Sequence, residues 1–231
     1  TLNFDDVAGF VEVHIEQGPV LAETGSNVGI VSDIRGPVRY RVTVSGTPGH
    51  SGATPMRIRS DAVAGACRMV ASVQDIVTEA SDGGDIVGTV GKIHSHHGAI
   101  NKVCDEVTFT VDIRSTDATY RESVAETVVS RFESISATHD LSIDVTYLDS
   151  TDPVSLDSRL ARLLEQSARD VDASYETIPS GGGHDAMNFA LRGIPAGMLF
   201  APSPNGISHN PAEDTDYDAV EDVTACLTRS I

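Results

Sequence analysis

The alternation of apolar and polar residues between positions 37 and 148 constrains the fold of this chain more than any other feature of the sequence. Residues 37–45 alternate strictly, which predicts a strand with one buried face. Residues 60–77 instead carry apolar side chains at three- and four-residue spacing, which predicts an amphipathic helix with Ser60 or Asp61 as its N-cap. This stretch therefore begins with a strand followed by a helix.

Two further strands, a second helix and a last strand complete the stretch. Residues 86–93 follow a Ser-Asp-Gly-Gly turn and are typical of a strand, and residues 107–113 alternate again. The second helix is expected to begin near Thr119, whose spacing to Glu122 suits a capping box, and residues 143–147 alternate after it. The predicted order is β-α-β-β-α-β, a self-contained ferredoxin-like module in which four antiparallel strands carry two helices on one face.

The segments that flank this module predict a separate α/β layer. Residues 10–15 and 194–200 are short apolar runs typical of buried strands. A helix is expected over residues 156–171, with four side chains on its inner face: Leu160, Leu163, Leu164 and Ala168. Two strands and about three helices make a thin layer, so the expected fold is an incomplete α/β domain interrupted by the β-α-β-β-α-β module.

The charge balance limits the partners of this chain. Among its 231 residues, 16 are basic and 34 are acidic, which gives a net charge of −18 at pH 7. A field of this sign repels nucleic-acid phosphates and anionic lipid headgroups, so neither nucleic acid nor a membrane is an expected partner. Only Lys92 and Lys102 are lysines, which indicates adaptation to high salt; an ordinary acidic protein is the alternative.

The cysteines and the N-terminal residues bear on the cellular compartment. Cys67, Cys104 and Cys226 are odd in number and widely spaced, without the density of a disulfide-stapled secreted domain. No apolar run approaches the roughly 18 residues of a membrane span, and residues 1–10 have neither the basic region nor the apolar core of a signal peptide. These observations predict a reducing, cytoplasmic location.

Two histidines occupy positions from which a side chain could bind a metal ion. His14 ends a strand-like run just before a Gly-Pro break, where side chains leave the carboxyl edge of a sheet. His209 lies in a polar loop after the strand that ends near Phe200. Either histidine alone is more often a hydrogen-bonded structural residue than a metal ligand, so both interpretations stay open.

Other candidates lie in turns and at a strand end. The glycine-rich turn at residues 180–186 leads into a predicted helix, so its backbone N–H groups are expected to face an anionic ligand. His50 lies in a loop between a strand and a helix, and Arg114 ends a strand two residues after Asp112; each also suits a purely structural role. The run His94-Ser-His-His97 is interpreted as a solvated loop in preference to a metal site.

Four ordered segments give a more specific signature: His14-Ile-Glu-Gln-Gly-Pro-Val-Leu21, Gly49-His-Ser-Gly-Ala-Thr-Pro-Met56, Gly181-Gly-Gly-His-Asp-Ala186 and Ser208-His-Asn-Pro-Ala-Glu213. In this combination the chain resembles the N-carbamoyl-L-amino-acid hydrolase and allantoate amidohydrolase branch of the dinuclear metallopeptidase family M20, also called hydantoinase/carbamoylase. The likeness extends over essentially the whole chain. It implies that residues 36–149 form the lid through which family members form homodimers, and that residues 1–35 and 150–231 belong to the catalytic domain.

The resemblance implies a two-metal amidohydrolase, usually with zinc and sometimes with manganese, cobalt or nickel, that cleaves the carbamoyl or ureido C–N bond of a small molecule. A histidine at position 14, where M20 peptidases usually have a carboxylate, favours an N-carbamoyl amino acid or an allantoate-like compound as substrate. The resemblance also implies a role for each candidate residue. The metal ligands would be His14 and His209, one for each ion, with support from His184 and Asp185. The substrate would be contacted by Gln17, Asn101, Arg114, Gly181 and Gly182, and its carboxylate would be held by Arg114 and Asn101. The charge that develops on the attacked carbonyl would be stabilised by His50 acting in the site of the partner subunit.

The resemblance also implies that part of the metal site lies outside this chain. The family's remaining ligands, a His, a bridging Asp and a Glu, and its general-base Glu belong to an N-terminal segment that nothing before His14 can supply. Two histidines without a bridging carboxylate do not hold two divalent ions. We therefore expect the chain to be the C-terminal part of an enzyme, inactive alone and weak in metal binding.

Two alternative functions remain open. An M20 peptidase or an N-acyl-amino-acid deacylase would share the fold and differ in substrate. A non-catalytic dimerisation or binding module would need no metal, and the missing ligands favour it.

Overall fold

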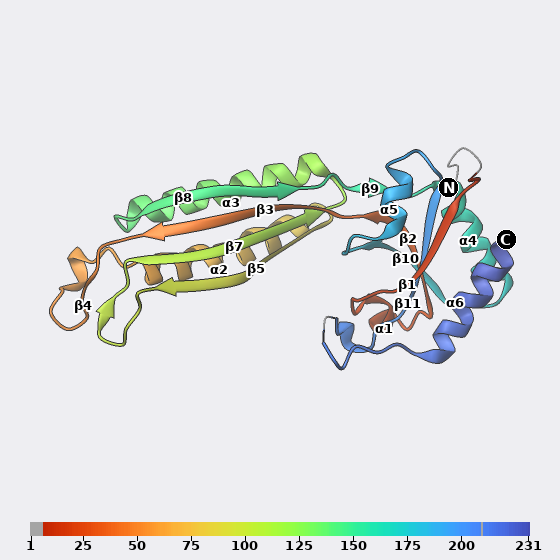
Figure 1. The fold of residues 1–231 in the computed structure, drawn as a ribbon. Helices are drawn as coiled ribbons and strands as arrows, with labels where there is room; N and C mark the ends of the chain where they lie inside the picture. Colours follow the sequence, from red (N-terminus) through yellow and green to blue (C-terminus); the bar gives the residue numbers. More distant parts are fainter. Residues whose placement is uncertain (1–6, 209) are drawn as a thin grey trace. The chain divides into compact units, whose positions relative to one another are not determined.

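The computed structural model describes residues 7–208 and 210–231, which form two compact units (Figure 1). Unit 1 consists of Thr1–Arg35 and Pro153–Ile231, and unit 2 is the continuous segment Gly36–Asp152. The chain therefore leaves unit 1 once and returns to it once. No helix in the described part of the chain combines the length and the apolar composition that crossing a bilayer requires.

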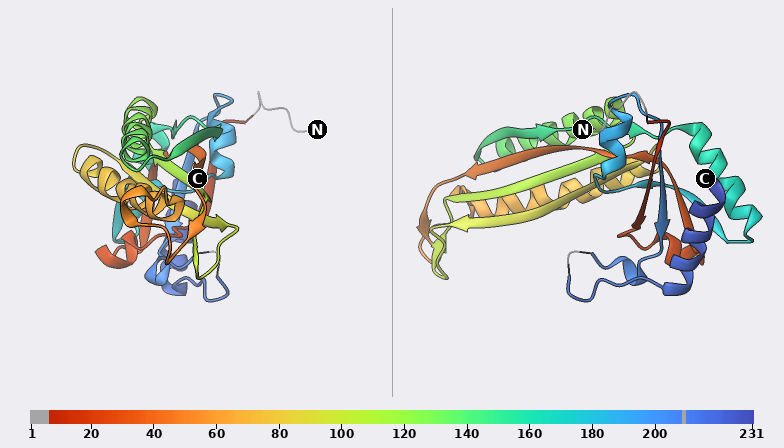
Figure 2. Two further views of the ribbon diagram at one scale, coloured as in Figure 1. Left: turned by 90° about the vertical axis from the view of Figure 1, so that its left-hand side faces the viewer. Right: turned by 45° about the vertical axis from the view of Figure 1, so that its right-hand side comes forward.

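Unit 2 is a four-stranded antiparallel sheet with two long helices on one face. Its main elements, in chain order, are β3 (Gly36–Ser45), α2 (Ala62–Ser81), β5 (Ile86–His96), β7 (Glu106–Ser115), α3 (Ala118–Thr138) and β8 (Ser142–Ser150). The strands lie in the order β5-β7-β3-β8, and Figures 1 and 2 show α2 and α3 on the same side of the sheet. The predicted β-α-β-β-α-β fold is confirmed.

The core of unit 2 lies between the sheet and the helices because the central strands alternate in burial. The inward residues of β7 are at most 1% exposed: Val107, Phe109, Val111 and Ile113. The ring of Phe109 meets the ring of Phe132 in α3 edge-on, with the ring centroids 5.5 Å apart, an arrangement that aromatic pairs favour. The intervening side chains of β3 and β7 point to the opposite side of the sheet, which we call the open face because the helices of unit 2 lie on the other side.

The N-cap of α3 differs from the expected one. The carboxylate of Asp117 accepts a hydrogen bond from the backbone N–H of Tyr120 at the start of the helix. The predicted capping box is wrong, because Thr119 already lies inside the helix and the carboxylate of Glu122 pairs with Arg121 at 2.8 Å. Aspartate is a stronger N-cap residue than threonine, so the helix begins earlier than the capping-box pattern predicts.

Unit 1 contains a five-stranded mixed sheet. Its strands are β1 (Phe10–Ile15), β2 (Val28–Ile34), β9 (Val154–Ser155), β10 (Tyr175–Ser180) and β11 (Ala196–Ala201), and its helices are α1 (Val20–Thr24), α4 (Ser158–Asp170), α5 (Asp185–Ala190) and α6 (Tyr217–Ser230). The strand order is β1-β11-β2-β10, and the short β9 pairs with β2. β1 and β11 are parallel, as are β2 and β10, whereas β11 and β2 run antiparallel.

Helices cover both faces of the unit 1 sheet. One face packs against α4 and α6 through a buried cluster that includes Ile30, Leu164, Leu199 and Val223. The other face packs against α1 and α5 through a cluster that includes Leu21, Ala186, Met198 and Phe200. All six residues of β11 are buried, as expected of a strand that is covered on both sides.

The α/β class is confirmed, but the thin two-stranded layer is wrong. The sequence did not predict β2, because most of its residues are buried and they do not alternate in polarity. It did not predict β10 either, because that strand has few apolar side chains. The helix expected at residues 156–171 is α4, although Leu163 is 43% exposed instead of inward. Leu160, Leu164 and Ala168 recur every fourth residue, and Leu163 lies beside that stripe.

Replacing Asp61 with Ala is expected to destabilise unit 2 by ~1 kcal/mol. Asp61 is the N-cap of α2, and its carboxylate accepts from two backbone N–H groups at 3.0 and 3.2 Å that would lose this partner. Asp75→Ala is the matched control, because Asp75 is exposed in the interior of the same helix, where Ala is the better helix former. Urea unfolding followed by circular dichroism measures both variants, and equal stability would contradict the capping role.

Candidate functional site

His14 lies at the carboxyl end of β1, as expected. Its Nδ1 is 2.9 Å from the carbonyl oxygen of Ile15, to which it can donate. Its ring contacts the ring of His184 edge-on, with the centroids 4.8 Å apart. A histidine that donates through Nδ1–H keeps the lone pair of Nε2, so Nε2 of His14 is the nitrogen that could bind a metal ion.

A carboxylate, an imidazole and a hydroxyl form a chain of polar contacts beside His14. Oε1 of Glu12 is 3.8 Å from Nδ1 of His184, and Nε2 of His184 is 2.8 Å from Oγ of Ser180. The other oxygen of Glu12 accepts from the backbone N–H of Ala186 at 2.8 Å. Glu12 therefore ties β1 to the start of α5 and lies beside His184. The one sequence signal for Glu12 is its position two residues before His14, on the same face of the strand.

Burial controls the ionisation of His184, whose side chain is 5% exposed. This burial lowers the pKa of the imidazole, and the neighbouring His14 lowers it further, whereas Glu12 and Asp185 act in the opposite direction. The neutral ring has one donor and one acceptor nitrogen, which suits its contacts with Glu12 on one side and Ser180 on the other. Asp185 is the first residue of α5, and His184 is its N-cap residue.

The glycine-rich turn uses backbone N–H groups within unit 1. The N–H of Gly182 donates to Oγ of Ser180 at 3.2 Å, and the N–H of Ala186 donates to Glu12. The expectation that these groups face an anionic ligand is therefore wrong at these two positions, because side chains of unit 1 already satisfy them. Gly181 lies beside the guanidinium group of Arg35.

Gln17 joins the first sequence motif to the fourth. Its side-chain amide donates to Oε1 of Glu213 at 3.0 Å. Its backbone N–H donates to Oγ of Ser203 at 2.9 Å, which holds Gln17 at a φ of 57°, in the left-handed region. The preceding Glu16 has a structural role that its sequence context did not reveal: its carboxylate accepts from two N–H groups at the start of α1, at 2.8 and 2.9 Å.

The described residues do not fit a complete metal centre. His209 lies outside them. Within residues 7–208 and 210–231, no three His, Cys, Asp or Glu side chains approach closely enough to hold a metal ion. His14 lies beside His184, and His184 lies beside Glu12, but Glu12 already accepts from the N–H of Ala186, and His184 already contacts the hydroxyl of Ser180.

In unit 2, the structure brings His50 and Asn101 together. The short strands β4 (Gly49–His50) and β6 (Lys102–Val103) pair, with His50 opposite Lys102. Beside this pair, the N–H of Ser51 donates to the carbonyl oxygen of Asn101 at 2.9 Å. His50 is exposed, and its Nδ1 accepts from a backbone N–H two residues later at 3.1 Å. Nε2 of His50 then carries the proton and can act as a hydrogen-bond donor.

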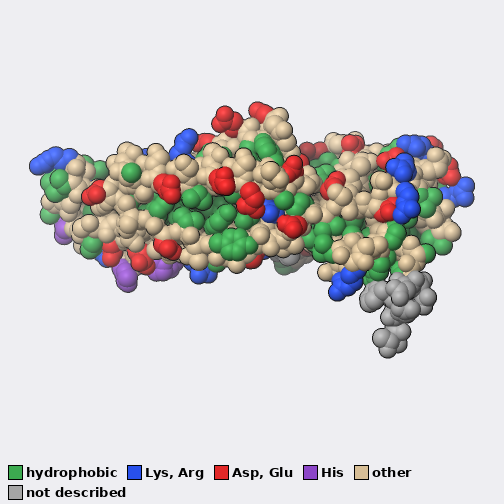
Figure 3. All heavy atoms as spheres, turned by 90° about the horizontal axis from the view of Figure 1, so that it is seen from above, with side chains coloured by type: hydrophobic (Ala, Val, Ile, Leu, Met, Phe, Trp, Pro, Cys, Tyr) green, Lys and Arg blue, Asp and Glu red, His purple; other side chains and the backbone are tan. Residues whose placement is uncertain are grey.

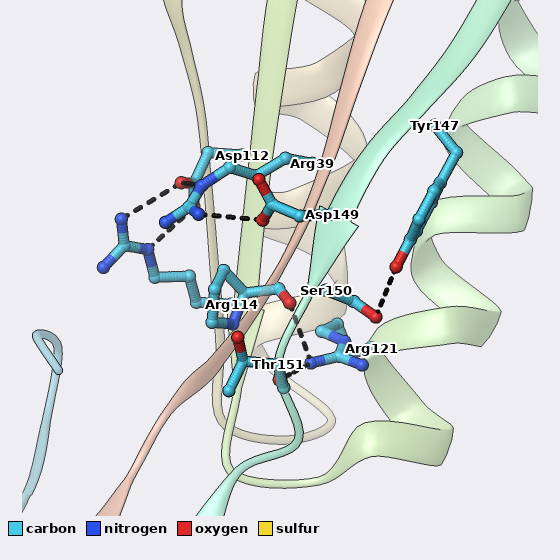
Figure 4. A network of polar contacts seen from close by, with 9 residues as sticks. Arg39, Asp112, Arg114, Arg121, Tyr147, Asp149, Ser150 and Thr151 are labelled. Carbon is cyan, nitrogen blue, oxygen red and sulfur yellow. Dashed lines mark hydrogen bonds and ion pairs between the residues drawn. The ribbon is translucent and has the colours of Figure 1, made fainter.

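Arg114 belongs to a network of ion pairs on the open face of unit 2 (Figure 4). Asp112 accepts from Nε and Nη2 of Arg114 at 2.7 and 3.0 Å, and from Nε of Arg39 at 2.7 Å. Arg39 also donates to Asp149 at 2.9 Å. Burial alone would raise the pKa of Asp112, but the hydrogen bonds from Arg114 and Arg39 outweigh it and hold that pKa below its ordinary value. Asp112 therefore stays ionised and fixes the plane of the Arg114 guanidinium.

Arg114 and Asn101 lie at opposite ends of unit 2. Arg114 pairs with Pro37 and Val87 near the end of β7, whereas Asn101 immediately precedes β6, before β7 begins at Glu106. The strand between Glu106 and Arg114 alone spans roughly 25 Å at the usual rise per residue. One chain therefore cannot place both residues on the same small carboxylate.

The interpretation of His94-Ser-His-His97 as a solvated loop is wrong for most of the run. β5 extends to His96, with His94 opposite Thr108 and His96 opposite Glu106 of β7. Only His97 lies beyond the strand, with a φ of 53°.

The sequence and the fold match known proteins along nearly the whole chain. The sequence profile of peptidase family M20/M25/M40 matches residues 2–231. An allantoate amidohydrolase from Escherichia coli is 38% identical over 212 residues, which are 91% of this chain and 51% of that protein. An N-carbamoyl-L-amino acid amidohydrolase from Geobacillus stearothermophilus is 35% identical over 207 residues, which are 90% of this chain and 50% of that protein.

A solved structure has the same fold. An amidase of the hydantoinase/carbamoylase family from Burkholderia multivorans superposes with a TM-score of 0.91 at 31% sequence identity, over 95% of this chain and 53% of that one. The chain spans about half the length of these relatives.

Replacing Glu12 with Ala is expected to loosen the start of α5 and to lower stability by ~1–3 kcal/mol, because the N–H of Ala186 loses a buried acceptor. Glu12→Gln, which keeps an acceptor oxygen, is expected to recover part of the loss. Amide hydrogen exchange at Ala186 and urea unfolding measure both effects. Glu176→Ala is the control, since Glu176 is exposed in a strand of the same sheet; unchanged exchange at Ala186 in Glu12→Ala would contradict the role of Glu12.

Proposed function

The chain belongs to peptidase family M20/M25/M40, and we propose on this premise that it forms part of a metal-dependent amidohydrolase of ureido compounds. The enzyme would hydrolyse the carbamoyl or ureido C–N bond of an N-carbamoyl amino acid or an allantoate-like molecule. The observation that carries the proposal is identity of 35–38%, over 90% or more of this chain, to relatives named for this chemistry. The histidine at the end of β1 in the first motif is consistent with that branch.

In this proposal, each unit contributes a different function. Unit 1 supplies His14 as one metal ligand and His209 as another, with His184 and Asp185 behind them. Gln17, Gly181 and Gly182 contact the substrate. The polar chain from Glu12 through His184 to Ser180 supports this assignment, because it fixes the ring that lies against His14.

Unit 2 supplies the groups that bind the ends of the substrate. Arg114 would hold the substrate carboxylate through its planar fork, which Asp112 keeps oriented. His50 would donate from Nε2–H to the carbonyl oxygen as negative charge develops there, where a preformed donor is most effective. Asn101, beside His50, would contact the same substrate.

The separation of these residues supports a homodimer as part of the proposal. Because Arg114 and Asn101 lie at opposite ends of one unit 2, a complete site that uses both needs them from two copies of the chain. We place the contact between the copies in unit 2, which has its own core and exposes long helices and edge strands. His50 and Asn101 of one copy would then serve the site of the other.

We propose that the complete enzyme uses two divalent metal ions, with zinc first and manganese, cobalt or nickel as alternatives. Since the described residues hold no complete metal centre, we propose that these 231 residues alone bind metal weakly and do not turn over substrate. The three free cysteines support a reducing cytoplasm, and the charge of −18 with two lysines supports a high-salt habitat.

A second candidate is a non-catalytic dimerisation or binding module. The observation that favours it is the absence of a three-ligand metal cluster within the described residues. The coding sequence immediately upstream of the Thr1 codon separates the two candidates. A continuing frame with a His-x-Asp segment and a Glu-Glu pair supports the enzyme, and a start codon within a few positions supports the module.

A substrate panel tests the activity on the product of the complete gene, loaded with zinc. N-carbamoyl amino acids or allantoate are expected to be hydrolysed, whereas dipeptides and N-acetyl amino acids are not. The 231-residue polypeptide, assayed in parallel, is expected to show no turnover. Preferential cleavage of a dipeptide or an N-acetyl amino acid would replace the proposal with a peptidase or deacylase, and turnover by the 231 residues alone would refute the inactivity.

Replacing Arg114 with Lys in the complete enzyme is expected to raise KM about tenfold, because a point charge replaces a two-pronged donor to the substrate carboxylate. Arg131→Lys is the matched control, since Arg131 is exposed on α3. Steady-state kinetics on an N-carbamoyl amino acid measure both variants. An unaltered KM in Arg114→Lys would remove Arg114 from the carboxylate site.

A further inference from the structure

A pocket on the open face of unit 2 gathers cationic and hydroxyl side chains. Its volume is about 370 Å³, and its lining includes Arg41, Lys92, His94, His96, Thr108 and Thr110. The proposed function uses none of these residues. Figure 3 shows that histidine side chains gather along one margin of the surface.

The strand register arranges the side chains of the pocket in rows across β5, β7 and β3. Lys92 of β5, Thr110 of β7 and Arg41 of β3 lie opposite one another across three strands. His94 and Thr108 form the next row. Neighbouring strands are about 4.8 Å apart, so the backbone positions of Lys92 and Arg41 flank Thr110 at roughly 10 Å from each other. Two long flexible cations can therefore converge on a small group above the threonine hydroxyls.

The two cations of this pocket are paired differently from Arg39 and Lys102 of the same unit. Arg39 pairs with Asp112 and Asp149, and Lys102 pairs with Asp105 at 2.8 Å. Within the described residues, Arg41 and Lys92 take part in no ion pair. Side chains of like charge that share a pocket repel each other unless an anion lies between them.

The two histidines add donors to the same pocket. Their rings meet edge-on with the centroids 4.5 Å apart. Nε2 of His96 is 3.1 Å from Oγ1 of Thr108 and 3.9 Å from Oε1 of the Glu106 carboxylate. The nitrogens of His94 have no hydrogen bond within the part of the chain that the structure describes. Two permanent cations and two imidazoles thus line the pocket, and no Asp or Glu is among its lining residues.

These observations distinguish an anion from a metal cation as the ligand. The described residues provide no third His, Cys, Asp or Glu that could hold a metal ion with the two histidines, and the charges of Arg41 and Lys92 repel a cation. The net charge of −18 does not exclude an anion, because carboxylates more than about 8 Å away are largely screened at physiological salt.

We propose that this pocket binds a small oxyanion with several acceptor oxygens, either free phosphate or the phosphoryl group of a small metabolite. Arg41 and Lys92 supply the charge, and His94, Thr108 and Thr110 supply further hydrogen bonds. Guanidinium, ammonium and hydroxyl groups are donors that suit phosphoryl oxygens.

Titration of the 231-residue polypeptide with inorganic phosphate tests the site, at fixed pH and with ionic strength held constant by sodium chloride. The amide signals of Lys92, His94 and Thr110 are expected to shift and to saturate in nuclear magnetic resonance spectra. Arg41→Gln and Lys92→Gln are each expected to raise Kd about tenfold. A parallel titration with glycerol phosphate separates the two sources, because tighter binding of the ester indicates a metabolite and equal binding indicates free phosphate.

Arg131→Gln is the matched control, because it removes the same charge from an exposed position on α3, across the unit from the pocket. It is expected to leave Kd unchanged. Linear, non-saturating shifts in the unaltered chain would overturn the proposal. A Kd raised as much by Arg131→Gln as by Arg41→Gln would also overturn it, since net charge and not the pocket would then account for binding.

Discussion

The buried guanidinium of Arg121 joins the segment by which the chain enters unit 2 to the segment by which it leaves. The side chain of Arg121 is 2% exposed, and its Nη1 donates to the carbonyl oxygens of Pro37 and Thr151 at 3.1 and 2.8 Å (Figure 4). The same Pro37 oxygen accepts the N–H of Thr151 at 3.0 Å. A buried charge is tolerated only when such partners compensate it, so the first residues of β3 and the residues after β8 must lie side by side. From this junction the sheet continues from β3 to β7 and from β7 to β5.

The length of this sheet determines how far apart the candidate site residues of unit 2 lie. His50 and Asn101 lie at one end of it, whereas Arg114 lies at the other, held by Asp112. A strand is a stiff spacer, so these groups cannot converge within one copy of the chain. Unit 1 differs, because its candidate segments come from distant parts of the sequence and are joined by hydrogen bonds between side chains and backbone or between side chains. Glu12 reaches the start of α5, and Gln17 reaches Glu213.

Local charge does not follow the net charge in this protein. The chain is strongly acidic, yet the open face of unit 2 has two different regions. In one region Asp112 and Asp149 neutralise arginines, and in the other Arg41 and Lys92 form no ion pair with any residue that the structure describes. Both regions lie on the same strands. The difference arises because alternation puts all these side chains on one face, while the order of residues along each strand decides which charges are opposite each other.

The elements with strong periodicity could be predicted from the sequence alone. Strict alternation marked the strands of unit 2, helical spacing marked α2, and four ordered motifs marked the family. The sequence did not reveal β2, which is mostly buried and does not alternate, β9, which has two residues, or β10, which has few apolar side chains. It also placed Thr119 as a cap and assigned His94 and His96 to a loop. The folded structure was needed to see that Glu12 lies beside His184, that Gln17 meets Glu213 and that Arg114 lies far from Asn101. These relations depend on strand register and on contacts between residues up to 196 positions apart, and no local pattern encodes them.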